Sequence, residues 1–203
     1  MPQLLKRLGR NAVGRLSLAT AAFVLGAIPY PYLNAWLEPR FDFMTSLDRA
    51  IPFVPWTLAV YACWLLLPAL AVVALEGSEL FRLLAGLLAC AALCYAGFAL
   101  FTAHFPRPSL EELGGSVWRG AYEWLHGVDG PGNTFPSLHV ALTAFAALRM
   151  RRHRLGAMWV GAAILISLST LTTRQHFVAD VAAGAVLASL VHLAIPRREA
   201  DRR

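Results

Sequence analysis

Charged side chains are scarce in this chain. Only 15% of its 203 residues are Asp, Glu, Lys or Arg, whereas 58% are apolar. So few charges cannot cover the surface of a water-soluble globule of this length, and this excludes that class of protein. The composition predicts an integral membrane protein. Because no linker, low-complexity tract or internal repeat divides the chain, we expect residues 1–203 to form one domain.

Cysteine and clustered carboxylates are also rare. Cys63, Cys90 and Cys94 all fall in apolar stretches, where a small packing residue is the simplest interpretation. Cys90 and Cys94 are four residues apart and lack further ligands nearby, which argues against a metal pair. No group of carboxylates offers a site for magnesium. The sequence therefore predicts no metal and no cofactor.

Six stretches with little or no charge are candidates to cross a bilayer, namely 16–37, 54–75, 83–105, 135–148, 155–173 and 177–195. A hydrocarbon core about 30 Å thick needs ~20 helical residues. The fourth stretch is shorter, and it crosses only if Arg149, Arg151 and Arg152 extend toward the lipid head groups. Pro29 and Pro31 should end or kink the first helix. The predicted fold is all-α and polytopic, with six transmembrane helices and the active site at one membrane face.

The basic residues would be divided unequally by six crossings. Five of the 18 would lie on one side, and thirteen on the other, namely Lys6, Arg7, Arg10, Arg15, Arg82, Arg149, Arg151, Arg152, Arg154, Arg197, Arg198, Arg202 and Arg203. The positive-inside rule then places both termini in the cytoplasm and the loop 104–134 outside. A cleaved signal peptide is the alternative for the N-terminus, although no clear cleavage site follows it.

The net charge of +6 raises the question of nucleic acid as a partner. The basic residues flank apolar spans, however, and do not form a stripe along a soluble face. We therefore expect the lipid bilayer and a membrane lipid as partners, and no nucleic acid. No feature of the sequence sets the oligomeric state.

His176 and Asp180 lie four residues apart at the start of the sixth stretch, so they share one face of a helix. The carboxylate can accept a hydrogen bond from one imidazole nitrogen, which leaves the other nitrogen as a nucleophile. Asp180 is the one acidic residue within the six stretches. An interhelical polar clamp is the structural alternative, but ionisable residues are costly in a membrane and usually mark functional sites.

His139 ends a second motif, Pro136-Ser137-Leu138-His139, at the start of the fourth stretch. Pro136 suits the first turn of a helix. Free backbone N–H groups at such a start, together with the positive end of the helix dipole, form a phosphate cradle that Ser137 could complete. A histidine beside that cradle could protonate a leaving oxygen. A lone histidine here would more often pack at the interface, but the second motif favours the catalytic interpretation.

Two arginines are candidate ligands for a phosphate. Arg107 follows the third stretch in the sequence F-P-R-P, on the same expected side as the two histidines. Its guanidinium could bind phosphate oxygens in a bidentate manner. Arg174, two residues before His176, is a second candidate, and contact with a lipid head group is its alternative role.

A further feature of the outer loop is the segment 116–126. Helical spacing would place Trp118, Tyr122 and Leu125 on one apolar face. The segment is therefore either a short interfacial helix that guides lipid to the site or an aromatic belt that only anchors the loop.

The motifs, taken in order, resemble those of the type 2 phosphatidic acid phosphatase superfamily. Arg107 and Pro108 match its R-P element, residues 136–139 match P-S-x-H, and residues 176–180 match H-x-x-x-D. The resemblance covers most of the second half of the chain. It implies that His176 forms a phosphohistidine, that Asp180 orients it and that His139 protonates the leaving group, without a metal.

Two positions depart from the family pattern, because Leu100 stands where the family has lysine and Thr170 where it has arginine. A monoester carries nearly two negative charges and a diester one, so fewer cations suit a diester better. The form F-P-S-L-H-V-A, the form Q-H-F-x-x-D and the stretch 47–56 are most similar to the inositol phosphorylceramide synthase branch. Members of that branch move a phosphate-bearing head group between lipids.

We therefore expect a phosphotransferase or phosphatase that acts on a lipid-linked phosphate in the bacterial inner membrane, with its active site facing the periplasm. Head-group transfer is favoured over hydrolysis. The first alternative is a plain lipid phosphatase for phosphatidate, phosphatidylglycerophosphate or a polyprenyl diphosphate. The second is a transporter or scaffold without catalysis. The complete triad argues against the second, as does the lack of a pair of broken helices repeated in the two halves.

Overall fold

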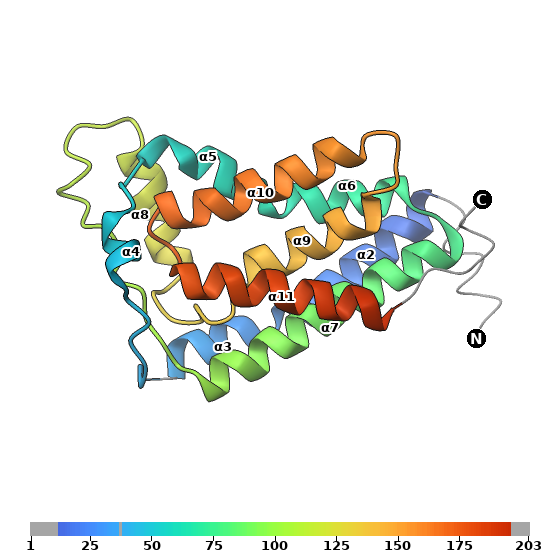
Figure 1. Ribbon diagram of the computed structural model, residues 1–203, viewed down its shortest axis with the longest axis horizontal. Coiled ribbons are helices and arrows are strands. Elements are labelled where there is room, and N and C mark those ends of the chain that lie inside the picture. Colours follow the sequence, from blue (N-terminus) through green and yellow to red (C-terminus); the bar gives the residue numbers. More distant parts are fainter. Residues whose placement is uncertain (1–11, 37, 196–203) are drawn as a thin grey trace.

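The computed structural model describes residues 12–36 and 38–195, which form a helical bundle (Figure 1). Its helices are α2 (Ala12–Ala27), α3 (Pro29–Trp36), α4 (Ser46–Ala50), α5 (Leu58–Tyr61), α6 (Leu66–Ala74), α7 (Gly77–Leu100), α8 (Arg119–Val128), α9 (Leu138–Met150), α10 (Gly156–Thr172) and α11 (Val178–Ala194). Two 3₁₀ turns, η1 (Pro55–Thr57) and η2 (Ala62–Trp64), flank α5. In this described part no strand forms, and the prediction of an all-α fold is confirmed.

Helix α9 lies inside the bundle and packs against α6, α7, α10 and α11. Two glycines permit close approach at its N-terminal end. A Cβ at Gly184 of α11 would lie 2.6 Å from the carbonyl oxygen of Ser137, and one at Gly97 of α7 would lie 2.3 Å from Cδ of Pro136. Either side chain would force the neighbouring segment away. The two glycines therefore fix the position of the segment that carries His139.

Prolines explain the interruptions of the first two predicted spans. Helix α2 ends at Ala27 and α3 begins at Pro29, so the expected break near Pro29 and Pro31 is confirmed. The second span consists of η1, α5, η2 and α6 in succession. Pro68 has no N–H for the carbonyl group of Trp64 and crowds that group, which accounts for the 3₁₀ turn that ends at Trp64.

The bounds of the third and fourth spans differ from the prediction. Helix α7 begins at Gly77, six residues before the expected start, because its charged Glu79 is neutralised by Arg82 and Arg149 and can lie within the helix. Helix α9 begins at Leu138, after an N-cap at Ser137 whose hydroxyl accepts a hydrogen bond from the N–H of Val140. Placing Pro136 in the first turn of that helix was therefore wrong, since Pro136 precedes the cap.

Arg149 does not extend toward the lipid head groups as expected. Its side chain is fully buried, where it pairs with Glu79 and donates a hydrogen bond of 2.8 Å to the carbonyl oxygen of Ile195. A buried guanidinium needs such partners, because desolvation without them is costly. Arg151 and Arg152 are exposed in the turn that follows α9. Arg149 thus connects α9 to α7 and to the end of α11.

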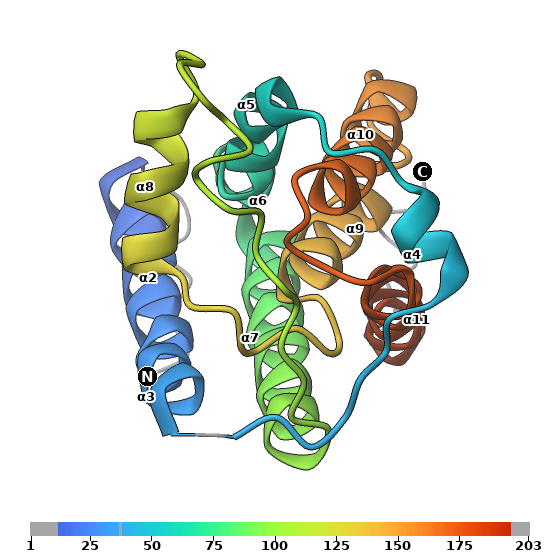
Figure 2. The same ribbon diagram turned by 90° about the vertical axis from the view of Figure 1, so that its left-hand side faces the viewer.

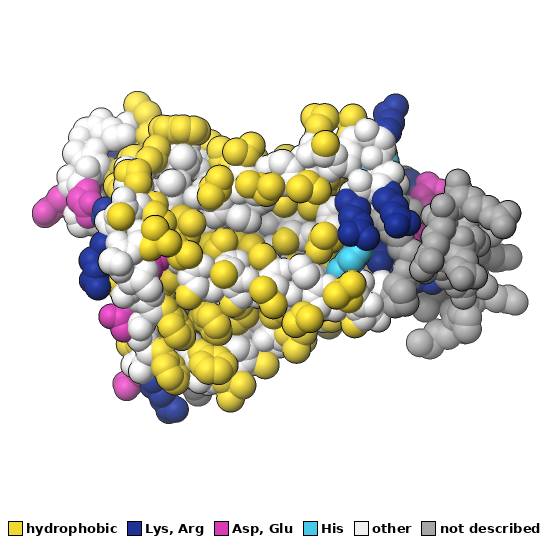
Figure 3. All heavy atoms as spheres, viewed as in Figure 1, with side chains coloured by type: hydrophobic (Ala, Val, Ile, Leu, Met, Phe, Trp, Pro, Cys, Tyr) yellow, Lys and Arg dark blue, Asp and Glu magenta, His cyan; other side chains and the backbone are white. Residues whose placement is uncertain are grey.

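Three helical stretches are long and apolar enough to cross a membrane, namely Val13–Asn34, Pro55–Ala74 and Gly77–Leu100. Helices α9, α10 and α11 are apolar but shorter. Many large apolar side chains of these elements are exposed. Figure 3 shows them as a broad band on one face of the molecule, with charged side chains gathered toward the two ends. Such a surface is typical of a protein whose middle contacts lipid.

Successive apolar helices alternate in direction, and this brings distant segments to the same end of the bundle. The turn between α6 and α7 and the turn between α9 and α10 lie at one end, where α2 begins and α11 ends (Figure 1). The loops before α5, after α7 and between α10 and α11 lie at the other end, together with α4 and α8. Figure 2 views the molecule from this second end.

Candidate active site

The two histidines of the predicted motifs face each other across the α9–α11 contact. Nδ1 of His139 lies 3.0 Å from Nε2 of His176, and Nδ1 of His176 lies 3.2 Å from Oδ2 of Asp180. All three side chains are buried. An ionised carboxylate only accepts hydrogen bonds, so we assign the hydrogen of His176 to Nδ1 and a lone pair to Nε2. The nitrogen suited to nucleophilic attack therefore points at His139.

The starts of α9 and α11 hold this arrangement through the backbone. The N–H of Ser137 donates a hydrogen bond of 3.0 Å to the carbonyl oxygen of Asp180, and Oδ2 of Asp180 accepts one of 2.9 Å from the N–H of Phe177. Asp180 is thus both the partner of His176 and a capping residue in the first turn of α11. The side chain of Ser137 is fully buried as the N-cap of α9.

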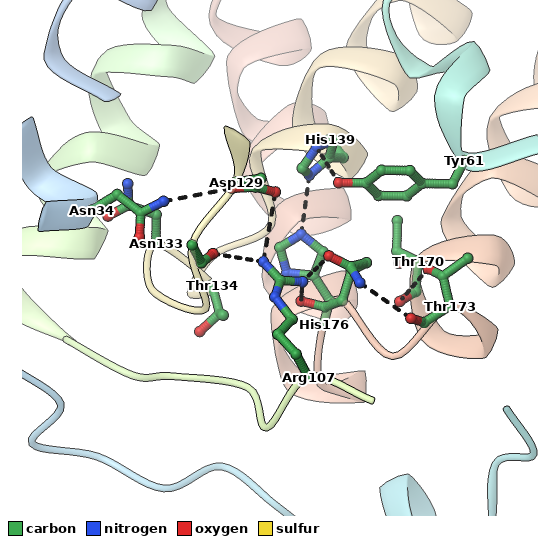
Figure 4. Close-up of polar contacts among 12 residues, drawn as sticks. Asn34, Tyr61, Arg107, Asp129, Asn133, Thr134, His139, Thr170, Thr173 and His176 are labelled. Carbon is green, nitrogen blue, oxygen red and sulfur yellow. Dashed lines mark hydrogen bonds and ion pairs between the residues drawn. The ribbon is translucent and has the colours of Figure 1, made fainter. Parts of the chain in front are cut away.

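Arg107 reaches the same region from the loop after α7, as Figure 4 shows. One guanidinium nitrogen donates to the side-chain oxygen of Gln175, and the other donates a hydrogen bond of 2.6 Å to the carbonyl oxygen of Gly130. The second nitrogen also lies 3.5 Å from a carboxylate oxygen of Asp129. Nε of Arg107 is buried and has no partner within the described residues. These contacts hold the positive charge of Arg107 beside the residue that precedes His176.

Arg174 is not brought into this group. Its guanidinium pairs with Glu112 at 3.2 Å and lies 5.5 Å from the centre of the Phe53 ring. The side chain is 36% exposed, and the backbone of Arg174 has a positive φ of 52°. These contacts direct the guanidinium toward the surface, so a phosphate contact by Arg174 stays a prediction.

The two positions that depart from the family pattern also differ in their surroundings. Leu100 ends α7 with 68% of its side chain exposed. Thr170 is fully buried near the end of α10, and its carbonyl oxygen accepts hydrogen bonds from the N–H groups of Gln175 and His176. Thr170 therefore shapes the turn that leads into His176, and its hydroxyl is bonded to the carbonyl oxygen of Ser167.

Several site residues were missed by reasoning from the sequence. The hydroxyl group of Tyr61 lies 2.8 Å from Nε2 of His139, and Gln175 orients Arg107. Thr57 and Tyr61, four residues apart, share one face of the second span, a polar pair that could have identified this face. No comparable signal marked Asp129, because its loop gives no periodicity.

A carboxylate of the short helix α4 supports the start of α11 from outside the site. Oδ1 of Asp48 accepts a hydrogen bond of 2.7 Å from the N–H of Val178, and Oδ2 accepts one of 2.8 Å from the N–H of Thr45. Burial raises the pKa of the Asp48 carboxyl, but hydrogen bonds from Thr45 and Val178 outweigh it and hold that pKa below its usual value. Asp48 therefore connects α4 to the helix that carries Asp180.

The segment 116–126 does contain a helix, α8, and Tyr122 and Leu125 lie on its buried face. That face packs with Leu58 and Tyr61 of α5, whereas Trp124 is exposed. Burial raises the pKa of the Tyr122 hydroxyl above its usual value. Helix α8 is thus packed against the helix that carries Tyr61.

An apolar cavity of about 990 Å³ opens beside His139. Side chains of α2, α3, α5, α6, α7 and α8 line most of it, and Leu138, His139 and Leu142 line its side toward α9. Polar groups lie on its wall at Tyr30, Tyr61, Asp129 and His139. In the described part of the chain, no three His, Cys, Asp or Glu side chains are placed to hold a metal ion.

Comparison with known protein families decides the membership of the chain. Residues 37–194, more than half of the sequence, match the family model of the PAP2 superfamily. The chain belongs to the PAP2 superfamily. No curated protein and no solved structure matched. PAP2 superfamily members are phosphatases that generally need no metal ion. Together with the three long apolar helices, this membership indicates a membrane protein with a phosphatase-type activity.

Proposed function

We propose that this PAP2 superfamily protein transfers a phosphoryl-containing group from a membrane lipid through a phosphohistidine. The lone pair of His176 Nε2 attacks phosphorus, and the bond from phosphorus to the leaving oxygen breaks. His139 gives a proton to that oxygen, and Asp180 stabilises the positive charge that develops on His176. The observation that carries the proposal is the buried series in which Asp180 Oδ2 contacts Nδ1 of His176, and Nε2 of His176 contacts Nδ1 of His139.

Arg107 and Ser137 are the proposed phosphate-binding residues. The guanidinium of Arg107 is held next to the turn before His176 by Gln175 and Gly130. A substrate phosphate would replace part of those contacts with charged hydrogen bonds, which are stronger than neutral ones. Ser137 belongs to the same proposal, because the start of α9 places its backbone at the site and the helix dipole favours an anion there.

The apolar cavity supports a lipid as the substrate. It reaches His139, the proposed acid, so an apolar leaving group would lie in the cavity while its phosphate faces His176. Its volume is at the upper end of the ~300 to 1,000 Å³ usual for small-molecule sites. A free sugar phosphate or inorganic pyrophosphate would leave such a space without suitable contacts.

Six crossings are proposed for this bundle, with both termini in the cytoplasm and the histidines near the outer face of a bacterial inner membrane. Three long apolar helices and three shorter ones that alternate in direction support this count (Figure 1). The unequal division of Lys and Arg supports the orientation. Polar partners for Arg149 support its place in a short apolar helix.

Head-group transfer, as in the inositol phosphorylceramide synthase branch, is the proposed form of the reaction. The small number of cations near His176 supports head-group transfer. Leu100 is exposed at the surface, Thr170 is neutral, and Arg174 pairs with Glu112. Water instead of an alcohol as the acceptor would make the protein a plain lipid phosphatase, and the assay decides between these two.

The test is an assay of purified protein in mixed micelles with phosphatidate, phosphatidylglycerophosphate, undecaprenyl diphosphate and phosphatidylinositol, each with and without a long-chain alcohol. Free phosphate and new lipid products are followed together. We expect a new phosphodiester lipid that depends on the alcohol, and its loss by orders of magnitude in His176→Ala, His139→Ala and Asp180→Asn. Release of phosphate without use of the alcohol would leave the phosphatase. Near-normal turnover of His176→Ala would refute the mechanism itself.

A further inference from the structure

Tyr61 contacts the proposed acid from a helix that carries none of the predicted motifs. Its side chain is 3% exposed, and its hydroxyl oxygen lies 2.8 Å from Nε2 of His139. Figure 4 shows the Tyr61 ring on one side of His139, with His176 on another. The Trp64 and His139 rings also pack edge to face, at a centroid distance of 4.6 Å. His139 is therefore held at both nitrogens and on its ring.

The helix of Tyr61 is itself fixed relative to the site. The hydroxyl of Thr57 lies 2.8 Å from the hydroxyl of Thr172, and the N–H of Val54 donates a hydrogen bond of 2.9 Å to the carbonyl oxygen of Thr172. These contacts join the start of α5 to the end of α10, four residues before His176. The contacts that join α5 to the end of α10 therefore fix the position of Tyr61 relative to His176.

Asp180, His176, His139 and Tyr61 form a series of hydrogen bonds, and the ionised Asp180 determines which atom donates in the bonds that join Asp180, His176 and His139. Asp180 accepts from Nδ1 of His176, so Nε2 of His176 has a lone pair and must accept from Nδ1 of His139. Before the reaction, Nε2 of His139 accepts from Tyr61 when His139 is neutral with its hydrogen on Nδ1, and donates to Tyr61 when His139 is an imidazolium. A hydroxyl can fill both roles by rotating its hydrogen. In either state the proton on the side of His176 is the one on Nδ1.

We propose that Tyr61 is a positioning residue that makes Nδ1, and not Nε2, the working nitrogen of His139. This inference rests on the proposed phosphohistidine reaction. Tyr61 itself does not touch the reacting atoms. It complements Nε2 in both protonation states of His139 and keeps the ring turned so that Nδ1 faces the phosphate bound at His176.

Both proton transfers of the proposed reaction pass through Nδ1 of His139. Imidazolium His139 donates its Nδ1 proton to the leaving oxygen, which receives the electron pair of the broken P–O bond, while Nε2 of His176 forms the new N–P bond. His139 is then neutral and donates its Nε2–H to the Tyr61 oxygen. In the second half, Nδ1 accepts the proton of the water or alcohol that attacks phosphorus, and the N–P electron pair returns to His176. Tyr61 is neutral throughout.

The test compares poor and good leaving groups. Tyr61→Phe is measured with whichever of phosphatidate and phosphatidylinositol the wild type uses faster, and with the matched aryl ester, p-nitrophenyl phosphate or bis(p-nitrophenyl) phosphate. Because kcat/KM reports formation of the phosphoenzyme, we expect it to fall about tenfold or more on the lipid, as a general acid contributes ~100-fold or more. On the aryl ester, whose leaving group needs no proton, we expect less than about a threefold change.

Two further variants separate positioning from folding. Tyr122→Phe is the matched control, because Tyr122 is buried in the same apolar cluster and its hydroxyl donates to the carbonyl oxygen of Pro55. It should keep wild-type kcat/KM on both esters. In a His139→Ala background, Tyr61→Phe should cause no further loss, since it acts through His139.

Several outcomes overturn the inference while leaving the proposed function intact. Equal losses on both esters would show a general structural role for Tyr61, as would additive losses in the double variant. No loss on the lipid would show that the hydroxyl does not matter. Failure of the proposed function is recognised separately, by a His176→Ala variant that remains active.

Discussion

Arg107 and Arg174 both lie near His176 in the sequence or in space, but they make different contacts. The Arg107 guanidinium is bonded to Gln175 and Gly130 beside the histidines, whereas that of Arg174 pairs with Glu112 and Phe53. These contacts favour Arg107 over Arg174 as the proposed phosphate-binding residue. The difference between the two arginines can be measured with matched substitutions.

Arg107→Lys should lower kcat/KM by about ten- to a hundredfold, because lysine cannot make two parallel hydrogen bonds and a charged hydrogen bond contributes about 1.5 to 3 kcal/mol. Arg174→Lys, the matched control, should remain within about threefold of wild type by the same conversion. Arg174→Asn removes the charge with a residue that tolerates the positive φ of this position. A large loss in either Arg174 variant would return Arg174 to the phosphate site.

The sequence was informative about residues whose spacing is helical. His176 and Asp180 could be paired because a separation of four places two residues on one helical face, and Asp180 stood out as an acid in an apolar stretch. Tyr61, Gln175 and Asp129 could not be placed in this way. Their contacts join segments tens of residues apart, and such contacts follow from helix packing, which no local pattern encodes.

At the scale of elements, the connection of Asp48 to the start of α11 has a predictable effect on stability. The folded pKa of Asp48 is lowered, so its contribution is present above the unfolded pKa of about 4 and is lost as the pH falls through the folded value. Asp48→Asn should lower the free energy of unfolding by about 2 kcal/mol at pH 7, because the amide cannot accept all the hydrogen bonds that the carboxylate accepts.

The measurement is thermal unfolding in detergent at a series of pH values. The difference in stability between wild type and Asp48→Asn should narrow below about pH 4, where Asp48 of the unfolded wild type becomes protonated, and shrink further as the pH falls through the lower folded pKa. Asp42→Asn is the control, because Asp42 is exposed and accepts one hydrogen bond, from the N–H of Met44. It should change stability by less than about 0.5 kcal/mol. A difference for Asp48 that stays constant down to pH 3 would show that its charge is not involved.

The elements themselves could be predicted in type but not in their bounds. Apolar stretches indicated every helix from α9 onward, because those helices are bordered by charged or polar turns. The start of α7 was missed, since the rule of few charges excluded Glu79 and Arg82 from the span. Glu79 pairs with Arg82 on its own helix and with Arg149 across the bundle, and these ion pairs offset the cost of the charges. The start of α9 depended on a cap at Ser137, which sequence reasoning had assigned to phosphate binding.

At the scale of the whole molecule, the alternating helices make a prediction about access from the two sides of a membrane. A tag inserted at Gly115, an exposed glycine with open space around it, should be accessible from outside the cell. The matched tag at Arg152, in the exposed turn between α9 and α10, should be protected there. Reporters at both termini should be cytoplasmic. Equal access to both tags would contradict six crossings.

The central claim is that His176 becomes covalently phosphorylated, and it can be tested directly. Protein is mixed for milliseconds with ³²P-labelled lipid substrate identified by the micelle assay, quenched in alkali and digested for peptide mapping. We predict label on His176 that is stable to base and released by acid, at near wild-type level in Arg174→Asn and undetectable in His176→Ala. Turnover without any trapped label, or label on a residue other than His176, would contradict the account.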